Sequence, residues 1–181
     1  MSFDEFVKLL SKIKNIGLPA ESSHFKMVPP SRKAFAKYSQ EQLQQAKRAG
    51  VLALFYPNIN FEVQLILTLR KTYKGVHSAQ VSLPGGKIEP HDIDLKATAT
   101  RETFEEIGVP ITKIEVVKKL SEIYIPPSNF YVQPFLGVLN ETPKFKMQEN
   151  EVEQLIEVKL ADLLNDENLV FKEMVTSCLL Y

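Results

Sequence analysis

The sequence predicts an α/β fold in one domain of ordinary size. The first observation is a series of short apolar runs of strand length, at residues 51–56, 61–70, 130–139 and 155–158. The second is a helical stretch in the middle of the chain, between a Pro-Gly-Gly turn at 84–86 and Gly108. The third is composition, because 44% of the 181 residues are hydrophobic, which is enough for a buried core.

The N-terminal residues predict a helical extension, residues 1–48, ahead of a main domain at 49–181. Apolar side chains recur at helical spacing at Phe3, Phe6, Val7, Leu10 and Ile13. We expect this helix, residues 3–15, to pack against the main domain or a partner subunit. The proline-containing residues 19–37 should form a connecting segment, and Ser39 should cap a short helix over 40–48.

The strands of the main domain follow from apolar runs and turn signals. Residues 51–56 and 61–70 read as a hairpin joined by Pro57-Asn58-Ile59-Asn60. Further strands are expected over 114–125, 130–139 and 155–158, followed by a short helix over 160–164. Pro134 indicates an edge or a bulge, because proline cannot donate to the ladder.

The central helix should begin at Asp92 or Asp94 as N-cap and end at Gly108. On a helical wheel one face carries Ile93, Ala97, Thr100, Phe104 and Ile107, and the opposite face carries Glu102, Glu105 and Glu106.

These glutamates are unfavourable for the helix itself. Glu102 and Glu106 form an i,i+4 like-charge pair, and Glu105 and Glu106 lie in the last turn, where the helix dipole disfavours anions. A hard divalent cation with oxygen ligands, typically Mg²⁺ beside phosphates, would offset the repulsion. Arg101 can reach Glu105 at i,i+4 and hold it. The alternative is an amphipathic helix with a solvated acidic face.

The spacing of Gly86, Arg101, Glu102, Glu105, Glu106, Gly108 and Val109 resembles the Nudix box: Gly, five residues, Glu, seven residues, then Arg-Glu-aliphatic-x-Glu-Glu-x-Gly-aliphatic. The resemblance implies a Nudix-type α/β/α sandwich with a mixed sheet. It implies Mg²⁺ or Mn²⁺ held by Glu102, Glu105, Glu106 and the Gly86 carbonyl. It also implies catalytic glutamates, with Glu106 or Glu151 accepting the proton of the attacking water and Glu105 assisting.

Two departures separate the chain from that box. Counting back from Arg101 places Ile93 at the first acidic position, and the gap from Gly86 is one residue longer. Asp92 and Asp94 flank the position, and Thr103 replaces an aliphatic residue.

Residues 67–86 resemble the upstream motif of the coenzyme A pyrophosphatase branch, through Arg70, His77, Gln80, Val81, Ser82 and the Pro-Gly-Gly turn. That resemblance implies coenzyme A or a derivative as substrate, cut into adenosine 3′,5′-bisphosphate and 4′-phosphopantetheine. It also implies six substrate contacts: Arg70, Lys74, His77, Gln80, Ser128 and Phe130. The basic members would suit an extra 3′-phosphate, whereas a solvated basic loop and ordinary turn chemistry are the structural alternatives.

Three other functions remain open. The same chemistry could act on ADP-ribose, a nucleotide sugar or a dinucleoside polyphosphate. The chain could be a sensor that binds a nucleotide without cleaving it, which the isoleucine at position 93 favours. It could also be an interaction domain with an acidic helix and no metal.

Charge and cysteine content bound the remaining partners. Acidic and basic residues balance at 22 each, which argues against general binding of nucleic acid and of anionic membranes. No apolar run reaches membrane-spanning length and the N-terminus lacks a secretory signal. A single cysteine, Cys178, suits a cytoplasmic protein. The expected partner is a nucleotide-diphosphate small molecule, and the N-terminal helix makes a homodimer a further expectation.

Overall fold

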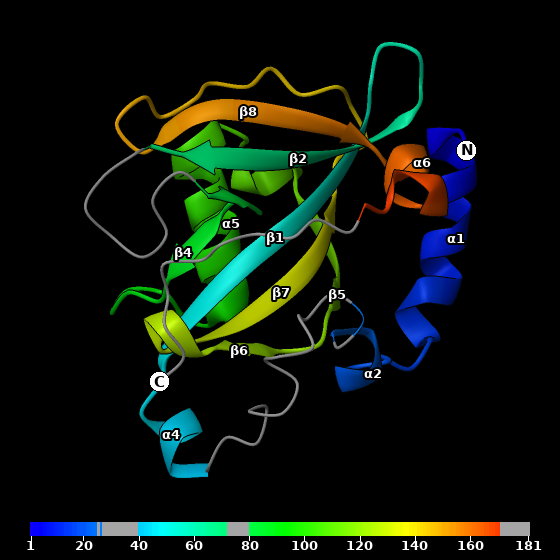
Figure 1. Ribbon diagram of the computed structural model, residues 1–181. Coiled ribbons are helices and arrows are strands. Elements are labelled where there is room, and N and C mark those ends of the chain that lie inside the picture. The colour runs from blue at the N-terminus through cyan, green and yellow to red at the C-terminus, as the bar shows by residue number, and fades with distance from the viewer. Residues whose placement is uncertain (25, 27–39, 72–79, 171–181) are drawn as a thin grey trace.

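The computed structural model describes residues 1–24, 26, 40–71 and 80–170. These residues form an α/β sandwich around one mixed sheet, as predicted (Figure 1). The strands are β1 (Lys47–Pro57), β2 (Val63–Arg70), β3 (Val81–Ser82), β4 (Gly85–Lys87), β5 (Glu115–Lys119), β6 (Ile123–Ile125), β7 (Phe130–Val138) and β8 (Val152–Lys159). The α-helices are α1 (Phe3–Asn15), α2 (Glu21–His24), α4 (Gln40–Gln44), α5 (Leu95–Ile107) and α6 (Leu160–Leu163). Single 3₁₀ turns lie at Ile111–Lys113, Pro126–Ser128 and Asp166–Asn168.

The long strand β1 is the axis of the sheet. It pairs in parallel with β7 from Lys47 opposite Phe130 to Phe55 opposite Val138. Its other edge pairs with β2 only near the β1–β2 turn, and with β4 near the start of β1. β1 and β2 therefore separate toward one end of the sheet, and β3 and β4 lie between them there. The edge of β2 that faces away from β1 pairs with β8, from Gln64 opposite Lys159 to Arg70 opposite Val152. The edge of β7 that faces away from β1 pairs with β5 and β6.

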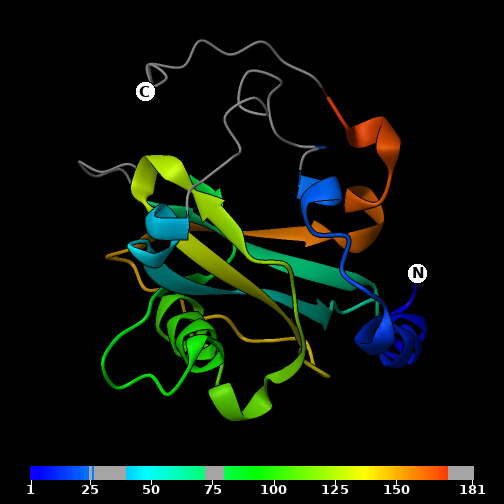
Figure 2. The same ribbon diagram turned by 90° about the horizontal axis from the view of Figure 1, so that it is seen from below.

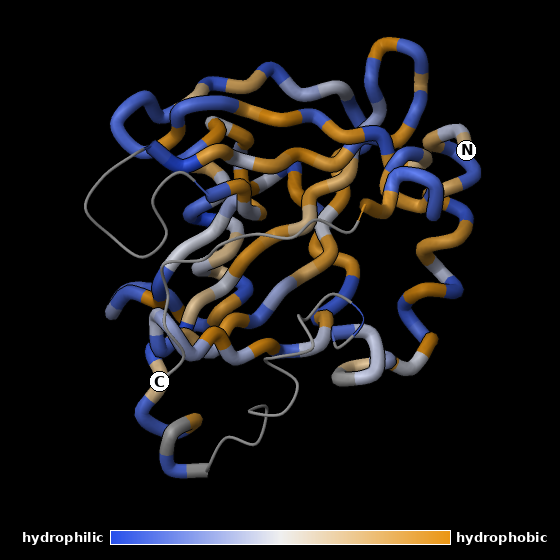
Figure 3. Tube along the Cα trace, in the orientation of Figure 1, coloured by the Kyte–Doolittle hydropathy of each residue, from blue (hydrophilic) through white to orange (hydrophobic). Residues whose placement is uncertain are grey.

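Each face of the sheet has its own apolar core, since successive side chains of a strand point to opposite faces. Under α5, the core contains Leu52, Leu54, Tyr56, Ile66, Ala99, Ile107, Val109, Phe135 and Leu139. On the other face, α1 packs onto the sheet through Phe3, Phe6, Leu10, Val63, Leu136 and Val138. Figure 2 shows α5 and α6 on opposite sides of the sheet, and Figure 3 shows apolar residues concentrated along the strands.

The N-terminal helix forms and packs as predicted. Ser2 and Glu5 make a capping box at its start, with Glu5 Oε2 accepting from the Ser2 amide at 2.9 Å. At its end, the Lys118 ammonium donates to the Ile13 carbonyl at 2.7 Å. Phe3, Phe6 and Leu10 are buried against the main domain, so this part of the expectation is confirmed.

Two predicted element ranges were wrong, and two short strands were missed. The short helix ends at Gln44, and Lys47 and Arg48 already belong to β1, because they pair with Phe130 and Tyr131. The expected strand over 114–125 is divided into β5 and β6. The short strands β3 and β4 were not predicted, since two or three residues around a Pro-Gly-Gly turn carry no periodic signal.

Pro134 lies inside the sheet rather than at its edge. β7 has β1 on one side and β5 and β6 on the other. Pro134 falls between the pairs Ile123–Val132 and Lys119–Phe135, opposite the gap between β6 and β5. Its carbonyl accepts from the Leu120 amide at 2.9 Å. An N–H at position 134 would face the Leu120 carbonyl in an antiparallel pair. That carbonyl instead accepts from Gln133 Nε2 at 2.7 Å, so a side chain replaces the ladder bond that proline cannot make.

No helix in the described ranges is both long and apolar enough to cross a membrane.

Candidate active site

The candidate site is built on α5, which lies against β1 and β4 at the open end of the sheet (Figure 1). Asp94 is the N-cap, and its carboxylate accepts from the Ala97 amide at 2.7 Å. Gly108 ends the helix in the left-handed region, with φ of 74°. Both ends agree with the prediction.

The buried face of α5 coincides only in part with the apolar face of the helical wheel, of which Thr100 and Ile107 are buried. Ile93 is 90% exposed and Phe104 is 49% exposed, whereas Thr103 and Glu106 are buried. Thr103 satisfies its hydroxyl by donating to the Ala99 carbonyl at 2.7 Å. α5 packs against both β1 and β4, and the Gly85 amide of β4 donates to the buried Glu106 carboxylate.

Asp92 anchors the arginine of the motif. Its carboxylate is almost fully buried and accepts from Arg101 Nε at 2.9 Å and Arg101 Nη2 at 3.0 Å. It also accepts from the Glu89 amide and the Thr98 hydroxyl, both at 2.9 Å. These bonds, those from Arg101 above all, hold the pKa of Asp92 well below its usual range.

The sequence analysis treated Asp92 only as a flanking residue or cap. If the position is instead counted forward from Gly86, five intervening residues (87–91) place Asp92 at the first acidic position. The extra residue therefore lies between Asp92 and Arg101. Arg101 also contacts Glu102 Oε1 at 3.0 Å and Glu105 Oε2 at 2.9 Å, so the predicted contact between Arg101 and Glu105 is present.

Glu106 is the most buried acid of the site, with 2% of its side chain exposed. One carboxylate oxygen accepts from the Gly85 amide at 3.1 Å, and the other lies 3.2 Å from Arg70 Nη1. Burial raises the pKa of Glu106 to about 7, against the opposing effects of Gly85 and Arg70, and nearby Glu102 and Glu151 raise it further. This carboxyl is therefore poised to exchange a proton near neutral pH.

Glu102 lies next to Gly86. A Cβ at Gly86 would come within 2.3 to 2.6 Å of the Glu102 carboxyl atoms, so only glycine allows this approach. Burial raises the pKa of Glu102, and so do Glu105 and Glu151, while Arg101 lowers it. Electrostatic repulsion therefore acts between two carboxylates of α5, Glu102 and Glu106, and Glu151 from a separate segment of the chain.

Glu151 is delivered by the segment 145–151, which we call the strap. Phe145 packs edge-on against Tyr56 in the core, with ring centroids 5.5 Å apart. The amide of Lys146 donates to the Ile107 carbonyl and that of Gln148 to the Glu106 carbonyl, both at 2.9 Å. The strap therefore satisfies carbonyls at the C-terminus of α5, and it ends where β8 begins.

The end of β2 brings two further predicted residues to the site. Arg70 is the last residue of β2, and its amide donates to the Gln80 carbonyl at 3.0 Å. The register between β2 and β8 shifts at this point, so that Arg70 pairs with Val152, and the Lys71 amide donates to the Glu151 carbonyl at 2.9 Å. Such irregularities commonly redirect side chains next to functional sites.

The remaining predicted contacts are not gathered with the acids. Ser128 lies in the 3₁₀ turn before β7, Phe130 is the first residue of β7, and β1 separates this strand from β4. The Ser128 hydroxyl is 3.4 Å from the Ile125 carbonyl, and Lys47 Nζ lies 5.6 Å from the centre of the Phe130 ring. Lys74 and His77 lie outside the described residues.

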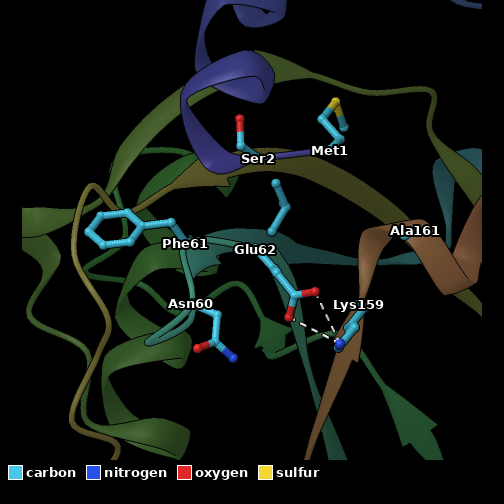
Figure 4. Close-up of a pocket in the computed structure, with 8 residues that line it drawn as sticks. Met1, Ser2, Asn60, Phe61, Glu62, Lys159 and Ala161 are labelled. Carbon is cyan, nitrogen blue, oxygen red and sulfur yellow. Dashed lines mark hydrogen bonds and ion pairs between the residues drawn. The ribbon is translucent and has the colours of Figure 1, made fainter.

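A cavity of about 260 Å³ lies at the start of β2 (Figure 4). The acids lie near the other end of β2, where Arg70 contacts Glu106. The cavity is lined by the two residues that precede α1, by the β1–β2 turn and by the start of α6, and the Glu62–Lys159 ion pair, at 3.0 Å, is part of its wall. Its position gives it no part in the acidic cluster.

The acids are positioned close together but are not assembled as ligands. In the part of the chain that the structure describes, no three acidic, histidine or cysteine side chains stand close enough to hold a metal ion as they are. Arginine contacts account for this, since Arg101 holds Glu102 and Glu105 while Arg70 holds Glu106. The donor set itself, carboxylates beside a backbone turn, is the kind that Mg²⁺ and Mn²⁺ prefer.

Comparison with known protein families shows that the family model for the NUDIX domain matches residues 46–177 of this chain. The chain belongs to the Nudix family. Similar relatives are Nudix hydrolase 15, mitochondrial, and Nudix hydrolase 22, chloroplastic, both from Arabidopsis thaliana. They are 40% and 38% identical, each over 67% of this chain. The Nudix chain spans 43% and 41% of their lengths, which is less than half of either protein.

A solved structure supports the Nudix fold independently of close sequence similarity. The NUDIX domain of Shewanella oneidensis NrtR, complexed with ADP ribose, superposes with a TM-score of 0.51 at 18% identity. The match covers 76% of this chain and 87% of that one.

Proposed function

We propose that this Nudix chain is a metal-dependent hydrolase of substrates in which a diphosphate joins a nucleoside to another group. The observation that carries the proposal is Glu106, buried under Gly85 and coupled to Glu102 and Glu151. Burying several mutually repelling carboxylates is costly unless a cation completes the site. Family membership supports the same chemistry, because Nudix hydrolases generally use divalent metal ions.

Glu102, Glu105, Glu106 and the Gly86 carbonyl are the groups that would hold Mg²⁺ or Mn²⁺. The bound ion would neutralise diphosphate charge and make a water molecule more acidic. The protein supplies the base: Glu106, with a pKa of about 7, or Glu151, on the strap beside it, would accept the proton of the attacking water. Arg101, anchored by Asp92, keeps Glu102 and Glu105 in place.

We further propose coenzyme A or one of its derivatives as the substrate. Support comes from the resemblance of residues 67–86 to the coenzyme A pyrophosphatase motif and from the position of Arg70 and Gln80 beside the acids. The proposed products are adenosine 3′,5′-bisphosphate and 4′-phosphopantetheine. Coenzyme A should be hydrolysed faster than 3′-dephospho-coenzyme A, because the basic residues would bind the extra phosphate. Equal rates, or faster hydrolysis of ADP-ribose, would redirect the substrate assignment without changing the chemistry.

A non-catalytic sensor is the main competing proposal, and Asp92 weakens it. The isoleucine at position 93 was its supporting feature, yet Ile93 points into solvent while Asp92 binds Arg101. The motif arginine therefore keeps an acidic partner despite the extra residue.

The test of catalysis is Glu106→Gln, assayed by phosphate-product release with Mn²⁺ and Mg²⁺. Glutamine can still accept from the Gly85 amide, so the fold should persist, which circular dichroism can verify. Turnover should fall by about 100-fold or more, the size expected for loss of a catalytic acid or base. Glu153→Gln, on the exposed side of β8, is the matched control and should keep wild-type turnover. Undiminished activity in Glu106→Gln would refute the assignment.

A further inference from the structure

Two arginines, Arg70 and Arg101, form ion pairs with the carboxylates of the site, and they differ in how firmly their own side chains are held. Arg101 makes two bonds to the buried carboxylate of Asp92, at 2.9 and 3.0 Å, in addition to its contacts with Glu102 and Glu105. Its guanidinium is therefore fixed in the structure whatever the state of the two glutamates.

Arg70 has no comparable anchor. Its Nη1 contacts Glu106 Oε1 at 3.2 Å, which is at the long end of the range for such bonds. Among the described residues, its Nε is buried and has no hydrogen-bond partner. An unpaired buried donor is unfavourable, so this side chain gains little from its present position beyond the ion pair with Glu106.

The backbone around Arg70 is held on both sides. Its amide is bonded to Gln80, and the next amide, of Lys71, is bonded to Glu151. The side chain is 25% exposed, so the guanidinium can turn toward solvent by rotation about its own torsions while β2 stays in place.

We propose that Arg70 is the resident counterion of Glu106, and that a divalent cation and Arg70 compete for this carboxylate. In the metal-free protein Arg70 compensates the buried charge of Glu106. With a cation bound to Glu106, the planar guanidinium of Arg70 would be released, and it would be able to bind the substrate diphosphate through two N–H groups. This role rests on the proposed metal-dependent function and adds to it a positioning residue that couples metal loading to substrate binding.

The exchange predicts that removing Arg70 strengthens metal binding. Isothermal titration calorimetry with MnCl₂ alone, without substrate, should show Arg70→Gln binding Mn²⁺ about fivefold more tightly than wild type, because the variant lacks one partly exposed ion pair that competes with the metal. Lys71→Gln is the matched control, because it removes an adjacent exposed positive charge. It should change the affinity by less than about twofold, the effect of a solvent-screened charge.

Thermal unfolding gives a readout that does not depend on turnover. In EDTA, Arg70→Gln should melt below wild type, because Glu106 loses its counterion. Saturating Mn²⁺ should shrink that difference, since the contact is already broken in the loaded wild type. Arg70→Lys, which keeps the charge but has no fork of donors, should bind Mn²⁺ with an affinity between those of Arg70→Gln and wild type, and it serves if Arg70→Gln does not fold.

The outcomes separate this inference from the proposed function. If wild type binds Mn²⁺ and Arg70→Gln binds it equally or more weakly, the exchange is wrong and the metal-dependent function stands. If Arg70→Gln and Lys71→Gln tighten binding equally, general charge explains the gain and the exchange is again wrong. If neither wild type nor Arg70→Gln binds Mn²⁺, both proposals fail.

Discussion

At the scale of single residues, the distances around Arg101 show which carboxylate fixes it. Asp92 makes two bonds to the guanidinium and is itself held by the Glu89 amide and the Thr98 hydroxyl. Glu105 is half exposed and makes one. Asp92 therefore anchors Arg101, and Arg101 in turn holds Glu105.

Asp92→Asn should destabilise the protein by about 3 kcal/mol, because a mostly buried arginine loses two charged hydrogen bonds and keeps only Glu102 and Glu105 as charged partners. The matched control is Asp94→Asn, two residues along, where asparagine is an equally good N-cap and the cost should be a few tenths of a kcal/mol. Urea unfolding of both variants in EDTA measures the difference. Equal, small losses in the two variants would show that Asp92 does not anchor Arg101.

Glu106 should make the stability of the metal-free protein depend on pH. Its pKa rises from an ordinary 4.5 to about 7 on folding, so the folded state binds more protons between these values. Stability from this group is fully present below about pH 4.5 and is lost as pH rises through 7, by up to about 3 kcal/mol. Denaturation in EDTA from pH 4.5 to 8 measures it. Glu106→Gln should remove this decline, and an identical profile in the variant would contradict the pKa assignment.

The residues of the site could be predicted only where spacing along the chain defines them. Glu102, Glu105, Glu106 and Gly86 followed from their intervals. The burial of Glu106 did not, because the wheel ranks faces by hydrophobicity, whereas Glu106 is buried where it binds the Gly85 amide and Arg70, and the apolar Phe104 is exposed. The contact between Arg70 and Glu106 joins residues 36 positions apart, and no local pattern encodes it.

At the scale of elements, the strap joins the two parts of the acidic cluster. Lys146 and Gln148 donate to the last carbonyls of α5, and Glu151 follows where the strap meets β2 and β8. Gly108 makes this contact possible. A Cβ there would lie 2.7 Å from the Lys146 Cβ and 3.0 Å from its carbonyl oxygen. The helix end thus fixes both the side chain of Glu106 and the path of the segment that carries Glu151.

Gly108→Ala should cost about 1 to 3 kcal/mol, from a positive φ and from displacement of the strap. Because the strap carries Glu151, turnover should fall more than substrate affinity. Gly17→Ala is the matched control, since nothing lies within 4 Å of a Cβ added there, and it should be nearly neutral. Urea unfolding and steady-state kinetics on both variants test this. A Gly108→Ala protein with unchanged turnover would show that the strap does not position Glu151.

Long, periodic elements could be read from the sequence, and short ones could not. The helices at 3–15 and 95–107 have caps, and the strands β1, β2, β7 and β8 have apolar runs. The two- and three-residue strands β3 and β4 depend on the opening between β1 and β2, which is a tertiary feature. The division of β5 from β6 likewise depends on Pro134 in the neighbouring strand.

At the scale of the whole molecule, the sheet separates the acidic cluster from the N-terminal helix α1. The acidic cluster and the core under α5 occupy one face, and α1 covers the other through its own core. The Nudix match begins at residue 46, so α1 lies outside it while still completing the fold. Stability contributed by α1 should therefore be separable from metal binding. Whether two copies associate stays a prediction.

Phe6→Ala tests this separation. The Phe6 side chain is buried, with its ring 5.2 Å from that of Phe55 and 6.2 Å from that of Phe3. Its loss should lower the free energy of unfolding by about 3 kcal/mol, the usual cost of truncating a buried phenylalanine. Val7→Ala, on the next and more exposed position of α1, should cost well under about 1 kcal/mol. Mn²⁺ affinity and turnover, measured well below the melting temperature, should equal wild type in both variants, because the sheet lies between α1 and the acids. A Phe6→Ala protein that is folded but binds Mn²⁺ more weakly would mean that the two faces are coupled through β1 and β7.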